Sequence, residues 1–181
     1  MSEATVRAAI VKFFTTPPIT GIQDVYNDEP WFLDGGKWTL QDNGGWGAIA
    51  YVHLDSSAET RLTVGGANAQ GTPTGQVNIL HTVSLLIQYQ YLIPANLPTG
   101  SREDAWVGPI DYIIDAAKTR IRSDPTFGTG AGGAIYQAGQ GDGQGGPHIR
   151  QTRDLPVLNA NRSKVLNWNR LEFDVREIIT A

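Results

Sequence analysis

The spacing of hydrophobic positions changes along the chain, and each spacing predicts a different element. Residues 6–14 place apolar side chains three and four positions apart, as one face of a helix requires, and Ser2 is available as the N-cap. Pro17 and Pro18 predict the end of this helix, because a residue before proline is pushed out of the helical region. Residues 22–26 then form a short candidate strand.

Two β patterns follow. Residues 46–54 alternate loosely, residues 55–58 are short and polar, and residues 59–64 alternate again, which predicts a hairpin that turns at 55–58. The strongest signal lies in residues 77–93, where only His81 interrupts an alternating series of apolar and aromatic side chains. This alternation predicts one long strand with a buried face.

The length of that strand is unusual. A strand over residues 77–93 would span about 55 Å at about 3.3 Å per residue, whereas ordinary strands run about 3 to 10 residues. We therefore expect one of two arrangements. Either the strand breaks or bends, or part of it extends beyond the protomer and another chain covers its exposed edge.

The second half of the chain predicts a second helix and a further strand. Residues 110–121 carry an apolar stripe at helical spacing and predict a helix. Its start fits equally well near residue 102 or, because Pro109 would be accepted in a first turn, near residue 108. Residues 171–176 alternate cleanly and predict a C-terminal strand, and the shift of apolar phase at residues 178–179 predicts a bulge.

Composition adds one irregular segment to this scheme. The chain has 181 residues with 21 glycines, and nine of these glycines fall within residues 128–147. This segment is expected to be a long Gly-rich loop or arm in which residues 134–137 form a short strand. The whole chain, residues 1–181, is therefore predicted to be a single α+β domain. It has a mainly antiparallel or mixed sheet, with two helices packed on one face.

The residue types of this chain offer few candidates for catalysis, metal binding or cofactor binding. The chain has no cysteine, which excludes disulfides, thiol nucleophiles and thiolate metal sites. His53, His81 and His148 lie in separate segments without companion ligands, so His81 is interpreted as a hydrogen-bonded structural histidine. The G-x-G-x-x-G pattern at 128–133 follows a predicted helix, the reverse of a dinucleotide site. No catalytic residue, metal or cofactor is predicted, although an enzyme using the acidic residues within 24–34 stays open as an alternative.

Charge is distributed unevenly along the chain. Residues 1–90 hold four basic and eight acidic groups, whereas residues 91–181 hold ten of each, and residues 148–170 carry a local charge of +4. This separation suits self-association through complementary surfaces, and two interleaved solvated faces would give the same count. The net charge of −4 gives no general attraction to nucleic acid or anionic membranes. The N-terminus lacks a signal-peptide pattern, which predicts a cytosolic protein.

Interface candidates come from aromatic and basic residues. Large rigid aromatics in loops often anchor interfaces, because they bury much area at little entropic cost. Aromatics that only plug the ends of the sheet remain the alternative. The candidate interface residues are the two adjacent loop aromatics and four basic side chains of the second half: Trp31, Phe32, Arg150, Arg153, Arg162 and Lys164.

The order of elements resembles that of a known family. A short N-terminal helix precedes the sequence VYNDEPWF at 25–32, a hairpin, and a long strand that contains His81. A second helix and a final strand with the pattern L-x-F-x-V-x-E at 171–177 follow. This arrangement resembles the tail terminator, or tail completion, proteins of long-tailed bacteriophages over nearly the whole chain.

The resemblance implies a structural virion protein with no enzymatic activity and no cofactor. Such a protein would form a homo-oligomeric ring, expected to be hexameric, that caps the tail tube, stops its polymerisation and joins it to the head connector proteins. It would be assembled in the host cytoplasm and lie at the head-proximal end of the tail. DNA would pass through the lumen without specific binding, and no membrane would be involved. Three alternatives remain: a head-completion or connector adaptor, a small α+β ligand-binding or hydrolytic enzyme, and a nucleic-acid binder using residues 148–170.

Overall fold

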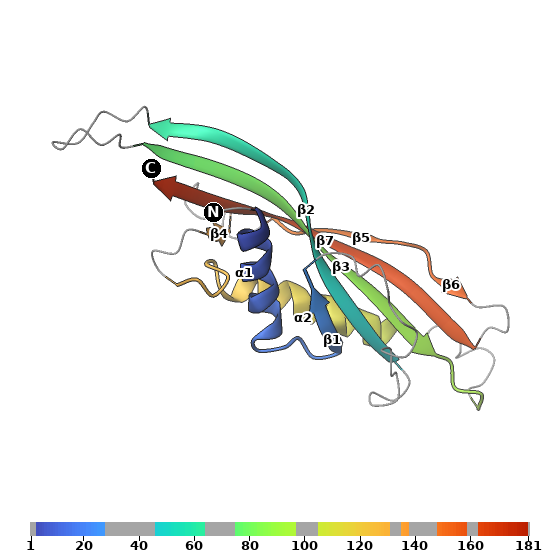
Figure 1. Cartoon of the computed structure of the whole chain (residues 1–181). Helices are drawn as coiled ribbons and strands as arrows, with labels where there is room; N and C mark the ends of the chain where they lie inside the picture. The colour runs from blue at the N-terminus through green and yellow to red at the C-terminus, as the bar shows by residue number, and fades with distance from the viewer. Residues whose placement is uncertain are drawn as a thin grey trace.

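The structure, a computed structural model, describes residues 3–27, 46–63, 75–96, 105–130, 135–137, 148–158 and 163–180. Its elements in chain order are α1 (Glu3–Thr15), β1 (Ile22–Tyr26), β2 (Trp46–Thr63), β3 (Gln76–Leu92), α2 (Val107–Ser123), β4 (Ile135–Gln137), β5 (Arg150–Arg153), β6 (Val157–Leu158) and β7 (Lys164–Thr180). The strands form one mixed sheet, and both helices lie on the same face of it (Figure 1). The predicted α+β fold is confirmed, whereas most of the predicted Gly-rich loop lies outside the described residues.

Three long strands make up most of the sheet. The central strand β3 pairs antiparallel with β2 on one side and with β7 on the other. The short strand β1 extends the β2 side of the sheet by parallel pairing, from Ile22 opposite Ala48 to Tyr26 opposite Tyr51. On the other side, β4, β5 and β6 each pair antiparallel with a different part of β7.

The long strand predicted over residues 77–93 forms in the structure as β3, and it is continuous. β3 spans 17 residues and keeps an unbroken register with β7 from Gln76 to Leu92. It needs no second chain to cover its edges, because β2 and β7 are almost equally long, at 18 and 17 residues, and the three strands curve together (Figure 1). The expectation of an exposed edge on this strand is therefore wrong, since β3 lies in the middle of the sheet.

The hairpin predicted within residues 46–64 is also wrong. These residues form the single strand β2, and the predicted turn is replaced by a bulge between Leu54 and Ser56. Asp55 occupies the bulge, and its carboxylate accepts a hydrogen bond from the buried Ser84 hydroxyl of β3. The short polar residues therefore form a bulge in the exposed part of β2 in place of a turn. The strand that pairs with β2 in a hairpin is β3.

The last strand is longer than its apolar pattern predicts. β7 begins at Lys164 and reaches Thr180 without a shift of register, so the predicted bulge at 178–179 is wrong. The reason is that polar residues occupy inward positions of this strand. Asn167 and Asn169 lie buried before Leu171, and Glu177 lies buried after Val175. These residues hid both the start of the strand and its constant phase.

One hydrophobic core joins the helices to the sheet. Helix α1 buries Val6, Ile10, Phe13 and Phe14, and α2 buries the predicted stripe of Ile110, Ile114, Ala117 and Ile121 together with Ile113. Because α2 begins at Val107, the predicted start near residue 108 is confirmed and the earlier start is wrong. The Arg120 guanidinium lies 4.1 Å from the centre of the Phe13 ring and donates to the Phe13 and Thr16 carbonyls. This side chain therefore fixes the end of α1 against α2.

Candidate assembly surface

The outer edge of the sheet beside β7 is formed by residues 150–158, all of which are exposed. Within the described residues, no further strand pairs with the other side of β5 or β6. Three large apolar side chains are exposed along this edge: Leu155 is 86% exposed, and Val157 and Leu158, which face opposite sides of the sheet as consecutive residues of β6, are each 50% exposed. We call these three residues the apolar edge patch. An unpaired edge strand with apolar side chains is a surface that another chain can cover.

A buried polar network holds this edge in place. Asn167 and Asn169 are at most 2% exposed. The Asn169 amide nitrogen donates to the Asn167 side-chain oxygen at 2.6 Å, and the Asn167 amide nitrogen donates to the Asp154 carbonyl at 2.7 Å. Arg153 donates to the Asn169 side-chain oxygen at 3.1 Å and to the Asp111 carboxylate of α2. The edge is therefore tied to both β7 and α2, and its apolar side chains are presented by a fixed backbone.

Two of the predicted basic interface residues flank the apolar edge patch. Arg150 forms an ion pair with Glu172 at 2.7 Å and is 67% exposed at its side chain. Arg153 is paired with Asp111, as described above. Lys164 lies half-buried at the start of β7, whereas Trp31, Phe32 and Arg162 lie outside the described residues. The structure thus brings Arg150 and Arg153 to one edge, and both have acidic partners in their own chain.

The apolar edge patch escaped prediction for a physical reason. Residues 148–158 contain neither strict alternation nor helical spacing, and their charges drew attention to a basic segment instead. Pro156 is the one signal that was available. Proline cannot donate to a strand ladder, so a short apolar run around it is typical of an edge strand.

The opposite edge of the sheet differs in character. β1 pairs with β2 only from Ala48 to Tyr51, and the described residues contain no partner for the rest of that edge. Beyond that point β2 carries the bulge after Leu54 and the exposed residues Asp55 and Glu59. Bulges and charges are devices that keep an edge strand from pairing with another chain. The two open edges are therefore not equivalent.

A second polar cluster has the residue types of a hydrolase triad. His81 is 2% exposed; its Nδ1 lies 2.8 Å from the Ser57 hydroxyl, and its Nε2 lies 3.1 Å from the carboxylate of Glu177. The Ser57 hydroxyl, however, donates its single proton to the Glu3 carboxylate at 2.9 Å. With its proton directed to Glu3, the Ser57 hydroxyl meets Nδ1 of His81 as an acceptor. A hydroxyl that accepts from the imidazole is not activated as a nucleophile.

This cluster therefore acts as a structural link. It joins α1 through Glu3 to β2, β3 and β7, and each of its polar side chains has a hydrogen-bond partner. The prediction that His81 is a hydrogen-bonded structural histidine is confirmed. Sequence spacing could not have assembled this cluster, because its members come from four separate elements.

Two hollows lie at the helix layer, away from the Ser57 cluster. One, of about 480 Å³, lies between the segment that follows α1 and one side of α2; its lining residues are Pro17, Pro18, Ile19, Thr20, Tyr112, Asp115, Ala116, Thr119, Arg120 and Ser123. We call this hollow the helix groove. The other, of about 520 Å³, includes Lys12, Phe13, Arg120 and Asp124. In the described ranges, no group of three or more histidine or acidic side chains is placed to hold a metal ion.

The one carboxylate in the second hollow serves the backbone. Asp124 accepts hydrogen bonds from the Thr126 hydroxyl at 2.7 Å, the Thr126 amide at 2.8 Å and the Gly128 amide at 3.0 Å. These bonds, led by that of the Thr126 hydroxyl, lower the pKa of Asp124 below its usual 3.8. Asp124 is therefore an ionised residue that closes the turn after α2.

No protein-family model matches the chain, and no curated protein matches it significantly. Among the described residues, neither helix has the length and apolar character needed to cross a membrane. The apolar edge patch and its polar anchor are therefore the features on which a functional proposal depends.

Proposed function

We propose that the chain is a structural protein whose copies associate through the sheet edge formed by β5 and β6. The observation that carries this proposal is the apolar edge patch, above all Leu155 with 86% of its surface exposed. Fully burying a side chain of this kind contributes about 1.5–3 kcal/mol. The network of Asn167 and Asn169 holds the patch in position before contact, so little ordering is needed on association.

The difference between the two open edges favours a ring over a symmetric dimer. One edge carries the apolar edge patch, whereas the β2 edge carries a bulge and exposed charges. Contact between two different surfaces of one chain is heterologous, and such contacts generate a closed ring when the rotation between copies is suitable. The predicted separation of acidic and basic segments is compatible with this type of contact.

The biological setting of this ring is proposed from the resemblance in element order. We propose a tail terminator of a long-tailed bacteriophage: a ring, hexameric by this resemblance, that caps the tail tube, stops its polymerisation and joins it to the head connector proteins. Its partners would be other copies of itself, the tail tube protein and the connector, with DNA passing through the lumen. It would act in the virion without a cofactor or catalysis. A head-completion or connector adaptor is the alternative, and only the partner separates the two.

Two substitutions on the apolar edge patch test this proposal. Leu155→Asp combined with Val157→Asp places charge on exposed positions, so the fold should persist while association weakens at least tenfold in the protein concentration required. Size-exclusion chromatography with light scattering measures the oligomer. The matched control is Ala4→Asp with Ala8→Asp, two exposed positions of α1 that lie away from both open edges and line neither hollow, which should assemble normally. Unchanged assembly of the Leu155 variant would contradict the proposal.

A further inference from the structure

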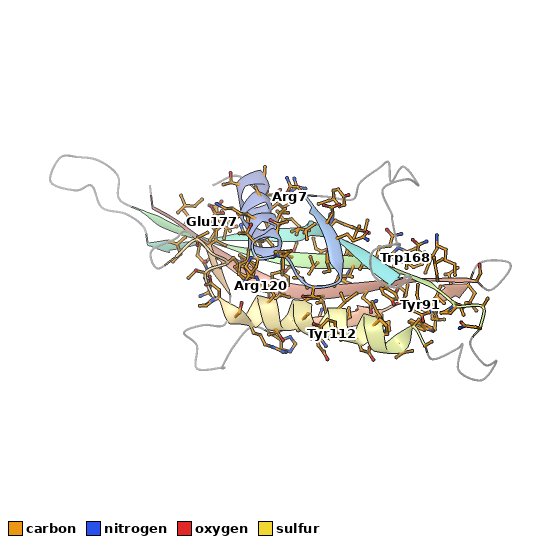
Figure 2. The ribbon with its side chains drawn as sticks, turned by 90° about the horizontal axis from the view of Figure 1, so that it is seen from below. Arg7, Tyr91, Tyr112, Arg120, Trp168 and Glu177 are labelled. Atoms are coloured by element: carbon orange, nitrogen blue, oxygen red, sulfur yellow. The ribbon has the colours of Figure 1, made fainter. Side chains whose placement is uncertain are left out.

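The helix groove is a concave apolar surface on the face of the molecule that the helices form. Pro17, Pro18 and Ile19 line one side, and Tyr112 and Ala116 on α2 line the other. Tyr112 is 56% exposed, so much of its ring is open to solvent beside these apolar neighbours. Figure 2, seen from below, shows Tyr112 and Arg120 on α2. The two prolines limit the backbone freedom of the first side, so the groove keeps its shape without an occupant.

Six of the ten residues that line the helix groove carry polar groups, although the surface that they turn toward the hollow is mainly apolar. The guanidinium of Arg120 donates to the carbonyls of Phe13 and Thr16 and stacks over the Phe13 ring. Asp115 lies at the rim, with its side chain 78% exposed and 3.8 Å from Lys118. A small-molecule site needs several convergent polar groups to orient its ligand, and here the Arg120 guanidinium and the Ser123 hydroxyl are directed to backbone carbonyls of the chain itself. The groove is better suited to apolar side chains of a protein.

We propose that the helix groove receives the apolar edge patch of a neighbouring copy of this chain. The inference rests on the proposed ring, and it names the second surface that a heterologous contact requires. The groove and the patch share no residue, so every copy can donate its patch to one neighbour and accept a patch from another. Leu155, the most exposed of the three, is the side chain that enters the groove.

Shape and charge both fit this pairing. The patch projects from a fixed edge strand, and the groove is a hollow of about 480 Å³ bordered by rigid backbone. The exposed Arg150 accompanies the patch, and the exposed Asp115 lies at the groove rim. Each is paired in its own chain, Arg150 with Glu172 and Asp115 with Lys118, so a polar rim of paired charges surrounds the apolar contact and can exchange partners across it. The open edge of β2 is the competing receptor, and its exposed Asp55 and Glu59 make it a poor surface for leucine.

Disulfide trapping tests this inference cleanly, because the natural chain has no cysteine. The double variant Leu155→Cys with Thr119→Cys places one thiol on the patch and one at an exposed position that lines the groove. Oxidation should give a ladder of linked chains on a non-reducing gel, because each copy is joined to two neighbours. Either single variant should give no species larger than a dimer, and a mixture of the two single variants should give mixed dimers.

A matched pair of variants identifies the receptor. Leu155→Cys with Thr60→Cys places the second thiol on the open edge of β2, and it should give no ladder. A ladder from this pair and none from the Thr119 pair would overturn the inference in favour of the β2 edge. Electron microscopy of the same samples separates the two claims. Rings without a ladder from the Thr119 pair would overturn the groove contact alone, whereas monomers throughout would overturn the proposed ring and the groove contact together.

Discussion

Single polar side chains decide where this sheet is held together. The inward positions of β7 include Asn167, Asn169 and Glu177, which would destabilise a core if their polar atoms lacked partners. The two asparagines hold the β5 edge, and the Glu177 carboxylate accepts a hydrogen bond from His81. Each of these three residues interrupts the apolar pattern of β7 at a point where another element contacts the strand. We therefore expect substitutions at these contacts to lower the free energy of unfolding.

The link between α1 and the sheet depends on one hydroxyl. Ser57→Ala removes the group that bonds both Glu3 and His81, and it leaves a nitrogen of the buried imidazole without that partner. We expect the free energy of unfolding to fall by about 1–3 kcal/mol in urea denaturation. Ser56→Ala is the control, because Ser56 is exposed beside it on β2 and should cost under about 0.5 kcal/mol. Equal losses from the two variants would contradict the structural role of the cluster.

The turn after α2 makes stability depend on acid pH. The ionised form of Asp124 accepts the hydrogen bonds of Thr126 and Gly128, so its pKa is lower in the folded chain than its usual 3.8. A depressed folded-state pKa gives stability that is present above 3.8 and is lost as pH falls through the folded value. Asp124→Asn should therefore be less stable than the natural chain at neutral pH, by under about 1 kcal/mol because the carboxylate is largely solvated.

Thermal unfolding between about pH 2 and pH 7 measures the difference in stability between Asp124→Asn and the natural chain. The difference should narrow as the pH falls below 3.8. Asp115→Asn is the control, because that carboxylate is 78% exposed and lies 3.8 Å from Lys118. A difference for Asp124→Asn that stays constant down to the lowest pH would contradict the role of the ionised carboxylate.

At the scale of elements, strict periodicity was predictable and irregularity was not. Helices α1 and α2 and the strand β3 follow patterns that only one kind of element can satisfy, and the structure confirms them. The hairpin prediction failed because Asp55 and its short polar neighbours fit a bulge as well as a turn. The start of β7 was missed because its polar inward residues are satisfied by β5 and α2, contacts that sequence spacing does not reveal.

The candidate surface was also predictable only in part, in its basic residues and not in its apolar ones. The basic residues Arg150 and Arg153 were predicted as interface residues from charge alone, and the structure places them on one edge. It also gives each an acidic partner in its own chain, so Arg153→Glu would disturb the fold as well as any contact between copies. Leu155 carries the proposal instead, and its exposure depends on how β5 and β6 pair with β7.

The anchoring of the β5 edge gives a prediction at this scale. Asn169→Ala removes the acceptor of Arg153 and the partner of Asn167, and it leaves polar groups buried. We expect a loss of about 1–3 kcal/mol and faster amide hydrogen exchange across residues 150–158, with α2 unchanged. Arg150→Ala is the control, since it removes one exposed ion pair and should cost at most about 1 kcal/mol. Unchanged exchange in Asn169→Ala would contradict the anchoring role.

The whole molecule is a long curved sheet with a helix layer on one face, and the sheet extends beyond the helices (Figure 1). Its two open edges have different chemistry, and the helix layer carries an apolar groove. A molecule with a projecting apolar edge and a separate concave surface is suited to repeated heterologous contact. The proposed ring on a tail tube is the form of assembly that unites these surfaces with the resemblance in element order.

Electron microscopy of the purified chain with tail tubes assembled from the tube protein of the same phage tests this claim most directly. The account predicts closed rings at the ends of tubes and tubes that stop growing once capped. The variant with Leu155→Asp and Val157→Asp should leave tube ends bare under the same conditions. A chain that remains monomeric and leaves the length and the ends of the tubes unchanged would contradict the account.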